Sequence, residues 1–252
     1  MKFFNVVSMV FVILISVIGC GNVSKDDEQL KLTFFDPSAA GVTDNHNFDI
    51  SAAFTENGIV LSQNSDGDII NTIPIEYDVY QLFIDMLDPE NGYLLYCSSP
   101  ACGQMMKFLY TTNDRWRTCS QKNISDKIDG YPTSFSVRSS EHFYIGTQLR
   151  SNGYLFETTD SGEQWTSVAV DTGIDTCSYG YVPVFEEDDG IIYALLKSDG
   201  SYLLYQSNDR QAAWEKVGTF VLDASIDQFF VDKGSLYIID MDGGKYLIEP
   251  KA

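Results

Sequence analysis

The residue types that most often do chemistry are unevenly represented in this chain. Its 252 residues include 36 Asp and Glu, but only two His, five Cys and five Arg. A glycosidase needs two carboxylates about 5–10 Å apart, and so many acids make such a pair available. The densest acidic run, 186–189, precedes Gly190 between two strand-like segments and is interpreted as a solvated hairpin. Neither His46 nor His142 lies near a nucleophile-elbow pattern, so no residue is nominated as catalytic.

The first twenty residues carry a chemical signal of another kind. A mostly apolar run of sixteen residues, 3–18, ends at Gly19-Cys20, whereas a spanning helix, the alternative reading, needs about 20. Val17-Ile18-Gly19-Cys20 resembles the lipobox of bacterial lipoproteins. The resemblance implies a signal peptide over residues 1–19, acylation of Cys20, including a palmitate-type chain, and a lipid anchor in the cell envelope. Gly21 after the cysteine favours the outer membrane.

The four remaining cysteines are Cys97, Cys102, Cys119 and Cys177. An even number in an oxidising compartment favours disulfides. The short CSSPAC loop predicts a Cys97–Cys102 bond, which leaves Cys119 with Cys177. Zinc or free thiols are the alternatives, but this spacing is not a zinc pattern and histidines are scarce. Asp-rich segments at 66–68 and 240–243 lack a full calcium-ligand set and are predicted to be turns. We therefore predict no metal and no cofactor.

The charge balance restricts the partners of the chain. Sixteen Lys and Arg oppose 36 Asp and Glu, a formal net charge of −20. Binding to nucleic acid needs clustered Lys and Arg, so nucleic acid is excluded as a partner. The acidity also argues against lying flat on anionic headgroups, and membrane attachment is expected through the lipid. A cationic partner or divalent ions remain open.

Three tryptophans, Trp116, Trp165 and Trp214, are spaced by 49 residues. The segment from Thr158 to Trp165 reads Thr-x-Asp-x-Gly-x-x-Trp, which resembles the Asp-box, or BNR repeat, of sialidase-like β-propellers. Three degraded copies accompany it. Ser207-Asn208-Asp209 to Trp214 has Gln211 in place of glycine, and 112–116 is interpreted as having lost three residues between Asp114 and Trp116. The weakest copy, 62–69, has Asn64 for Asp and Ile69 for Trp.

The Asp-box resemblance implies a hairpin between the third and fourth strands of a propeller blade. Asp and Ser or Thr oxygens accept backbone N–H bonds in such turns, glycine relieves a strained position, and tryptophan covers the hairpin. These residues are therefore expected to be structural: Asp114, Trp116, Thr158, Asp160, Gly162, Trp165, Ser207, Asp209 and Trp214.

The surrounding segments read as short strands separated by turns, without a sustained helical period after residue 20. Four strands per roughly 49-residue unit is typical of a blade. We expect an all-β, small β-propeller of about five four-stranded blades, with a tether at 20–29 and one domain over 30–252. The units are 47–75, 79–120, 133–170, 179–220 and 226–250. The strand 30–35 is expected to supply the missing outer strand of the last blade and close the ring. An open sandwich is the alternative.

Sialidases of this architecture share an arginine triad and an Arg-Ile-Pro-like strand. None of the five arginines, Arg115, Arg117, Arg138, Arg150 and Arg210, lies in an Arg-x-Pro context. The chain is similar to the BNR-repeat lipoproteins and, more loosely, to propeller assembly factors of photosynthetic membranes. The expected function is therefore a non-enzymatic scaffold that binds a protein or glycan partner. The alternatives are a carbohydrate-active enzyme with a central acidic pocket and a spacer.

Overall fold

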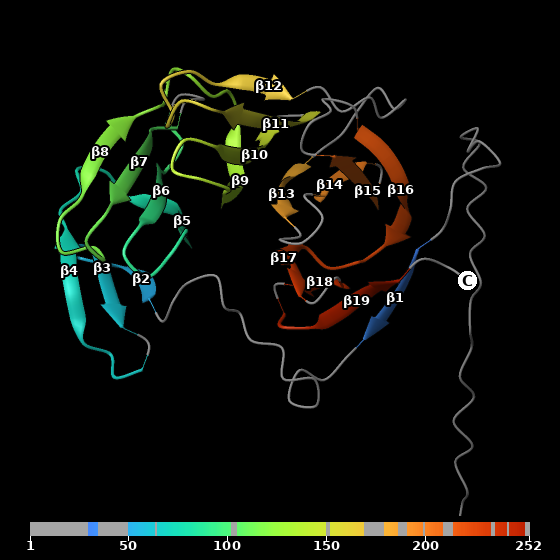
Figure 1. The fold of residues 1–252 in the computed structure, drawn as a ribbon, viewed down its shortest axis with the longest axis horizontal. Helices are drawn as coiled ribbons and strands as arrows, with labels where there is room; N and C mark the ends of the chain where they lie inside the picture. Colours follow the sequence, from blue (N-terminus) through green and yellow to red (C-terminus); the bar gives the residue numbers. More distant parts are fainter. Residues whose placement is uncertain are drawn as a thin grey trace, which may run out of the picture.

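The computed structural model describes residues 30–34, 50–63, 65–101, 105–149, 152–168, 179–185, 191–198, 200–208, 214–232, 235–240 and 242–249. These residues form nineteen β-strands in five antiparallel sheets, and they contain no helix (Figure 1). In this part of the chain no helix is long and apolar enough to cross a membrane. The expected all-β class is confirmed.

Each sheet is built from strands that are neighbours in the sequence, apart from β1. The first sheet contains β2 (Ile50–Thr55), β3 (Gly58–Gln63) and β4 (Ile69–Ile73). The second contains β5 (Val79–Met86), β6 (Gly92–Ser98), β7 (Lys107–Thr112) and β8 (Ser120–Asn123). The third contains β9 (Tyr131–Val137), β10 (Phe143–Leu149), β11 (Asn152–Thr158) and β12 (Thr166–Val168).

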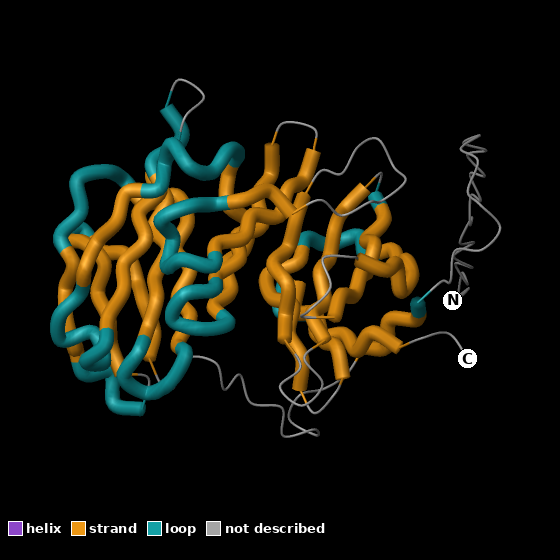
Figure 2. Tube along the Cα trace, turned by 45° about the horizontal axis from the view of Figure 1, so that its top comes forward, coloured by secondary structure: helices purple, strands orange, loops and turns teal. Residues whose placement is uncertain are grey.

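The fourth sheet contains β13 (Tyr179–Phe185), β14 (Ile191–Ser198), β15 (Ser201–Asn208) and β16 (Trp214–Val221). The fifth contains β17 (Ile226–Asp232), β18 (Ser235–Asp240), β19 (Lys245–Glu249) and, beside β19, the N-terminal β1 (Lys31–Phe34). Figure 2 shows that the described connections are loops and turns at the ends of strands. The sheets fall within the predicted units, give or take a few residues at the ends.

The five sheets follow one another around an arc in the order of the sequence (Figure 1). The first strands of the second to fifth sheets form a continuous inner row, because β5 contacts β9, β9 contacts β13, and β13 contacts β17. β2 contacts β5 at the start of this row. A succession of antiparallel sheets with their first strands innermost is a propeller-like arrangement.

The middle strands of the second, third and fourth sheets are largely apolar on both faces because each of these sheets packs between two others. β6 is buried along its whole length. Leu94 and Tyr96 join the cluster shared with the first sheet, and Leu95 and Cys97 join the cluster shared with the third sheet. Successive side chains of a strand point to opposite faces, so one continuous apolar run supplies two interfaces. This explains the near-continuous hydrophobic segments in the sequence.

The N-terminal strand completes the fifth sheet. β1 pairs antiparallel with β19, with Leu32 opposite Ile248, and Leu30 N–H donates to the carbonyl of Thr219 in the fourth sheet at 2.7 Å. Leu30 itself is buried in the cluster between the fourth and fifth sheets. The predicted pairing of the N-terminal segment with the last unit is confirmed.

The first sheet has three strands rather than four in the described residues. Its β3–β4 hairpin pairs Ser62 with Ile69, seven residues later. In the fourth sheet the hairpin between the third and fourth strands pairs Ser207 with Trp214 at the same separation. β3 and β4 therefore correspond to the third and fourth strands of the other sheets, and β2 corresponds to their second strand. In those sheets a first strand pairs with the inner edge of the second strand.

Candidate functional site

The hairpin between β11 and β12 carries the best copy of the Asp-box. Thr158 Oγ1 accepts the Gly162 N–H at 3.0 Å, and Asp160 Oδ1 accepts the Gln164 N–H at 2.8 Å. Ser161 and Gly162 both have positive φ, 58° and 82°. The hydrogen bond from Gln164 is the main reason that the pKa of Asp160 lies below its ordinary value. The Asp160 carboxylate and the Thr158 hydroxyl thus stabilise the turn by accepting backbone hydrogen bonds.

The hairpin between β7 and β8 makes the same turn with different side chains. Thr112 Oγ1 accepts the Trp116 N–H at 3.0 Å, and Asp114 Oδ1 accepts the Thr118 N–H at 2.9 Å. Arg115 and Trp116 have positive φ, 57° and 66°. Trp116 therefore occupies the position of the box glycine, and Cys119, seven residues after Thr112, occupies that of the box tryptophan. The expectation of a loop shortened by three residues is wrong, because the turn has its full length.

The three tryptophans nevertheless have a common location, the interface between their own sheet and the preceding one. Trp116 is fully buried against the first sheet, and its Nε1–H points to Met86 Sδ at 3.2 Å. Trp165 packs on the cluster between the second and third sheets, and Trp214 on the cluster between the third and fourth. Asp209 lies outside the described residues, whereas Ser207 is buried beside Trp214 in β-sheet register.

The box loops of the second and third sheets are each tied to the first hairpin of their own sheet. The Arg115 N–H donates to the Glu90 carbonyl at 2.9 Å, and the equivalent Ser161 N–H donates to the Glu141 carbonyl at 3.0 Å. In this way the positive-φ residue of each turn places its amide on a neighbouring loop. Two loops of each sheet thereby form one fixed rim.

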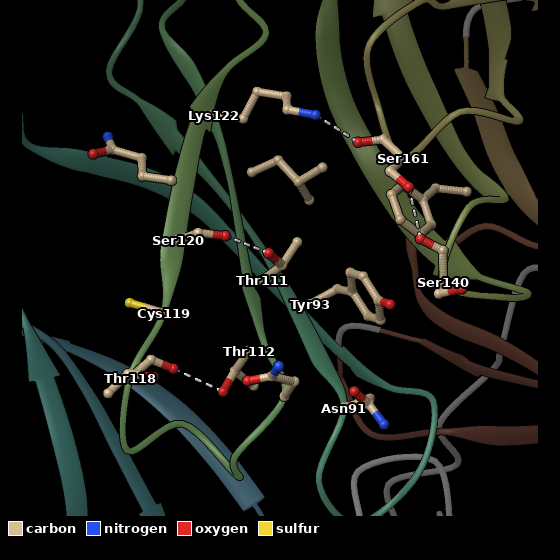
Figure 3. A pocket seen from close by; sticks show the side chains of 14 residues that line it. Asn91, Tyr93, Thr111, Thr112, Thr118, Cys119, Ser120, Lys122, Ser140 and Ser161 are labelled. Carbon is tan, nitrogen blue, oxygen red and sulfur yellow. Dashed lines mark hydrogen bonds between the residues drawn. The ribbon is translucent and has the colours of Figure 1, made fainter.

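A cavity of about 650 Å³ opens between the second and third sheets beside these rims (Figure 3). One wall is formed by β7, β8 and the turn between them. The other is formed by the β9–β10 hairpin and the β11–β12 loop. The lining residues are Asn91, Tyr93, Leu109, Thr111, Thr112, Asn113, Thr118, Cys119, Ser120, Gln121, Lys122, Ser140, Phe143 and Ser161.

Ten of these fourteen side chains end in a hydroxyl or a carboxamide, and none is a carboxylate or an imidazole. Figure 3 shows the Thr111 and Ser120 hydroxyls, 2.7 Å apart, on one wall, with Ser140 and Ser161 on the other. Within the described chain, the side chains of Asn113, Gln121 and Ser140 have no protein hydrogen-bond partner. The cavity therefore offers neutral donors and acceptors, and no pair of acids for bond cleavage.

Two lysines join the walls of the cavity at one end. Lys122 Nζ donates to the Ser161 carbonyl at 2.8 Å and lies 2.7 Å from Glu163 Oε1. Lys127 Nζ donates to the Glu163 carbonyl at 2.7 Å. The hydrogen bond from Lys122 is the first cause of a pKa for Glu163 below its ordinary value. The charge of Lys122 is therefore paired within the contact between the second and third sheets.

The cysteines in the described residues, Cys97 and Cys119, are free thiols, so the structure does not support the predicted disulfides. Burial raises the pKa of Cys97 to about 12. Burial is also the larger cause of a raised pKa at Cys119 in the cavity wall, followed by the nearby Asp114. Their expected partners, Cys102 and Cys177, and the lipidation residue Cys20 lie outside the described residues, so these assignments stay predictions.

The described histidine belongs to a polar cluster on the third sheet, outside the cavity. His142 Nε2 lies 2.5 Å from Glu157 Oε1, which also accepts the Tyr144 hydroxyl at 2.9 Å. The His142 hydrogen bond is the main reason that the pKa of Glu157 is lowered. His46, Arg150, Arg210 and the acidic run 186–189 lie outside the described residues. Sequence reasoning missed this cluster, whose signal is the cross-strand register of Tyr144 with Glu157.

The two Asp-rich segments considered as calcium loops are turns where they are described. Asp240 Oδ1 accepts the Asp242 and Gly244 N–H groups at 2.9 and 2.6 Å. Asp66 Oδ1 accepts the Asp68 N–H at 3.0 Å. Among the described residues no group of three or more His, Cys, Asp or Glu could hold a metal ion.

No family model and no curated protein sequence matches this chain. Several solved structures do match it. The structure of BBS1N in complex with ARL6DN is similar at a TM-score of 0.52 and 14% identity, covering 80% of this chain and 61% of that chain. YCF48 from Cyanidioschyzon merolae is similar at a TM-score of 0.50 and 11% identity, covering 90% and 68%. At such identities the likeness shows the fold alone, which is propeller-like.

Proposed function

We propose that this chain is a non-enzymatic binding protein of the cell envelope, held by a lipid on Cys20, whose propeller-like domain carries a protein or glycan partner. In this proposal five blades form the ring, and β1 closes it by completing the last blade. The observation that carries the binding role is the cavity between the second and third sheets. Its lining can form many hydrogen bonds and contains neither a carboxylate nor an imidazole.

The similar fold of BBS1N, which was solved in complex with ARL6DN, is consistent with a propeller-like domain that holds a partner. The alternative is a carbohydrate-active enzyme with a central acidic pocket. That reaction needs two carboxylates facing a sugar. Glu157 is hydrogen-bonded to His142 and Tyr144 and lies outside the cavity, so the described site favours binding.

The binding role is tested with the purified lipoprotein in detergent. Defined glycans and unstructured peptides are each titrated into the protein in a calorimeter. Each ligand is then recovered, and its mass is measured by mass spectrometry. We expect saturable binding of at least one ligand that is recovered intact. Recovery of a cleaved glycan would show that the protein is an enzyme. Failure of every ligand in the panel to bind would contradict the binding role.

The anchor is tested separately, in bacteria that express the full chain. The wild-type protein should fractionate with membranes and carry the mass of a diacylglyceryl and an acyl group on Cys20. A Cys20→Ser variant should lose both the lipid mass and signal-peptide cleavage. An unlipidated wild-type protein would contradict the anchor without touching the binding role.

A further inference from the structure

We infer that the cavity between the second and third sheets binds an uncharged glycan segment, an assignment that rests on the proposed binding function. The cavity volume of about 650 Å³ lies inside the range of roughly 300–1,000 Å³ usual for small-molecule sites. It opens beside two loops that are tied to neighbouring hairpins. The site is therefore large enough for a ligand and is already formed.

The hydrogen-bonding groups of the cavity match those of a sugar. A hydroxyl donates one hydrogen bond and accepts two, and a carboxamide does both as well. The hydroxyl of Ser140 and the carboxamides of Asn113 and Gln121 have no protein partner in the described chain. Sugar hydroxyls also act as donors and acceptors at once, so each of these groups can be satisfied in more than one sugar orientation.

The floor of the cavity is apolar and closely packed, with Tyr93 5%, Leu109 1% and Phe143 0% exposed. Tyr93 and Phe143 have ring centroids 4.8 Å apart in a tilted arrangement, and Leu109 lines the cavity beside them. Figure 3 shows the Tyr93 ring between the two walls. A sugar ring that enters the cavity therefore meets mainly the polar walls, and it contacts the floor at the small exposed part of Tyr93.

The charges select an uncharged glycan. The cavity contains one charged side chain, Lys122, which is already paired with Glu163 at 2.7 Å. A uronic or sialic acid finds no free cation there, and the formal net charge of −20 repels it at a distance. A peptide could pair with the outer edge of β8, which adjoins the cavity, but it finds no free charged side chain there for its termini. A neutral glycan leaves no unpaired charge behind.

The experiment uses the full lipoprotein in detergent and four probes: triacetylchitotriose, maltotriose, trigalacturonic acid and an alanine tetrapeptide with an acetylated N-terminus and an amidated C-terminus. Affinities are measured by calorimetry. The blocking variant is Ser120→Arg, which introduces a long side chain on the cavity wall. Its matched control is Thr166→Arg, because Thr166 is the exposed residue at the equivalent start of β12 and does not line the cavity.

We expect at least one neutral trisaccharide to bind, and Ser120→Arg to weaken it by tenfold or more while Thr166→Arg leaves it within about twofold. Unchanged affinity in Ser120→Arg would overturn the cavity assignment but leave the binding function. Binding of only the peptide, or of only trigalacturonic acid, would overturn the neutral-glycan class. Failure of all four probes would overturn the inference, and the wider panel of glycans and peptides then decides the binding function by itself.

Discussion

At the residue scale, two equivalent turns place a tryptophan at the interface with the preceding sheet from different positions of the turn. In the third sheet the turn position is Gly162, where an added Cβ would lie 3.2 Å from Leu109 Cδ2. The large side chain comes later, at Trp165. In the second sheet the turn position holds Trp116, and the later position holds the smaller Cys119. Each turn thus supplies one indole to its interface, although from different positions of the turn.

Replacing Trp116 by glycine should separate backbone strain from packing. Glycine accepts the positive φ of 66°, which relieves about 1 kcal/mol, but loss of a fully buried indole costs about 3–5 kcal/mol. We expect a net loss of about 2–4 kcal/mol in the free energy of unfolding, measured with urea. Gly162→Ala should also destabilise, because φ and space both oppose a Cβ there. A more stable Trp116→Gly protein would show that strain outweighs packing.

Lys107 is a buried cation, and its surroundings compensate only part of the free-energy cost of removing its charge from water. It is 3% exposed, and its Nζ donates to the Met105 carbonyl at 3.3 Å. Burial is the main reason that its pKa lies below its ordinary value of 10.5. Because the folded chain disfavours the charged form, the cost is fully present at low pH and disappears as pH rises through 10.5.

Lys107→Met should therefore stabilise the protein at neutral pH by about 1 kcal/mol, and the gain should shrink as the pH approaches 10.5. Melting temperatures at pH 7 and at about pH 10 provide the measurement. Lys122→Met is the matched control. It removes contacts to Ser161 and Glu163 and should not stabilise. A destabilised Lys107→Met protein at neutral pH would mean that the Met105 hydrogen bond outweighs the desolvation.

At the element scale, the box hairpins depend on ionised carboxylates. The pKa values of Asp114 and Asp160 both lie below the ordinary 3.8, in each case first because a backbone N–H donates to the carboxylate. A lowered folded pKa means that the stabilisation is present above the unfolded pKa and is lost as pH falls through the folded one. The turns should therefore weaken in acid.

A double variant, Asp114→Asn with Asp160→Asn, tests this dependence. It should melt at a lower temperature than the wild type at pH 7, and the difference should narrow as pH falls from about 5 to 3. The control pair, Asp126→Asn with Asp223→Asn, removes the same charge from two carboxylates to which no backbone N–H donates in the described residues. If the gap stays constant with pH, the carboxylate charge contributes nothing to the turns.

At the scale of the whole molecule, the two ends of the described chain meet in one sheet. β1 covers the edge of β19, and Leu30 fills part of the core between the fourth and fifth sheets. An uncovered edge is a template for intermolecular pairing. The N-terminal strand therefore both stabilises the last sheet and protects it.

A chain that begins at Leu30 should melt like the unlipidated full-length protein, whereas one that begins at residue 35 should not. The shorter chain loses the buried Leu30, worth about 1.5–3 kcal/mol, together with the partly buried Leu32, and exposes β19. We expect a lower melting temperature and aggregation, followed by calorimetry and light scattering. Equal melting of the two chains would remove β1 from the folding unit.

The sequence predicted features that depend on local chemistry. The alternation of apolar runs and turn residues gave an all-β chain with five units, because strands and turns are specified by near neighbours. Thr158 and Asp160 were recognisable because their hydrogen bonds close within six residues. The free edge of the last unit and the spare strand at the start of the chain were enough to predict their pairing.

Only the tertiary structure decided which residue occupies each position of a turn and where the cavity lies. Trp116 aligned by its type with Trp165, yet it sits in the place of Gly162 and packs in the cluster shared with the first sheet. The cavity combines Asn91 with Ser161, 70 residues apart in the sequence. By itself the sequence determined the hydrogen bonds and periods that close locally. Volumes between sheets depend on side chains from distant segments, so these were decided by the packing of the whole chain.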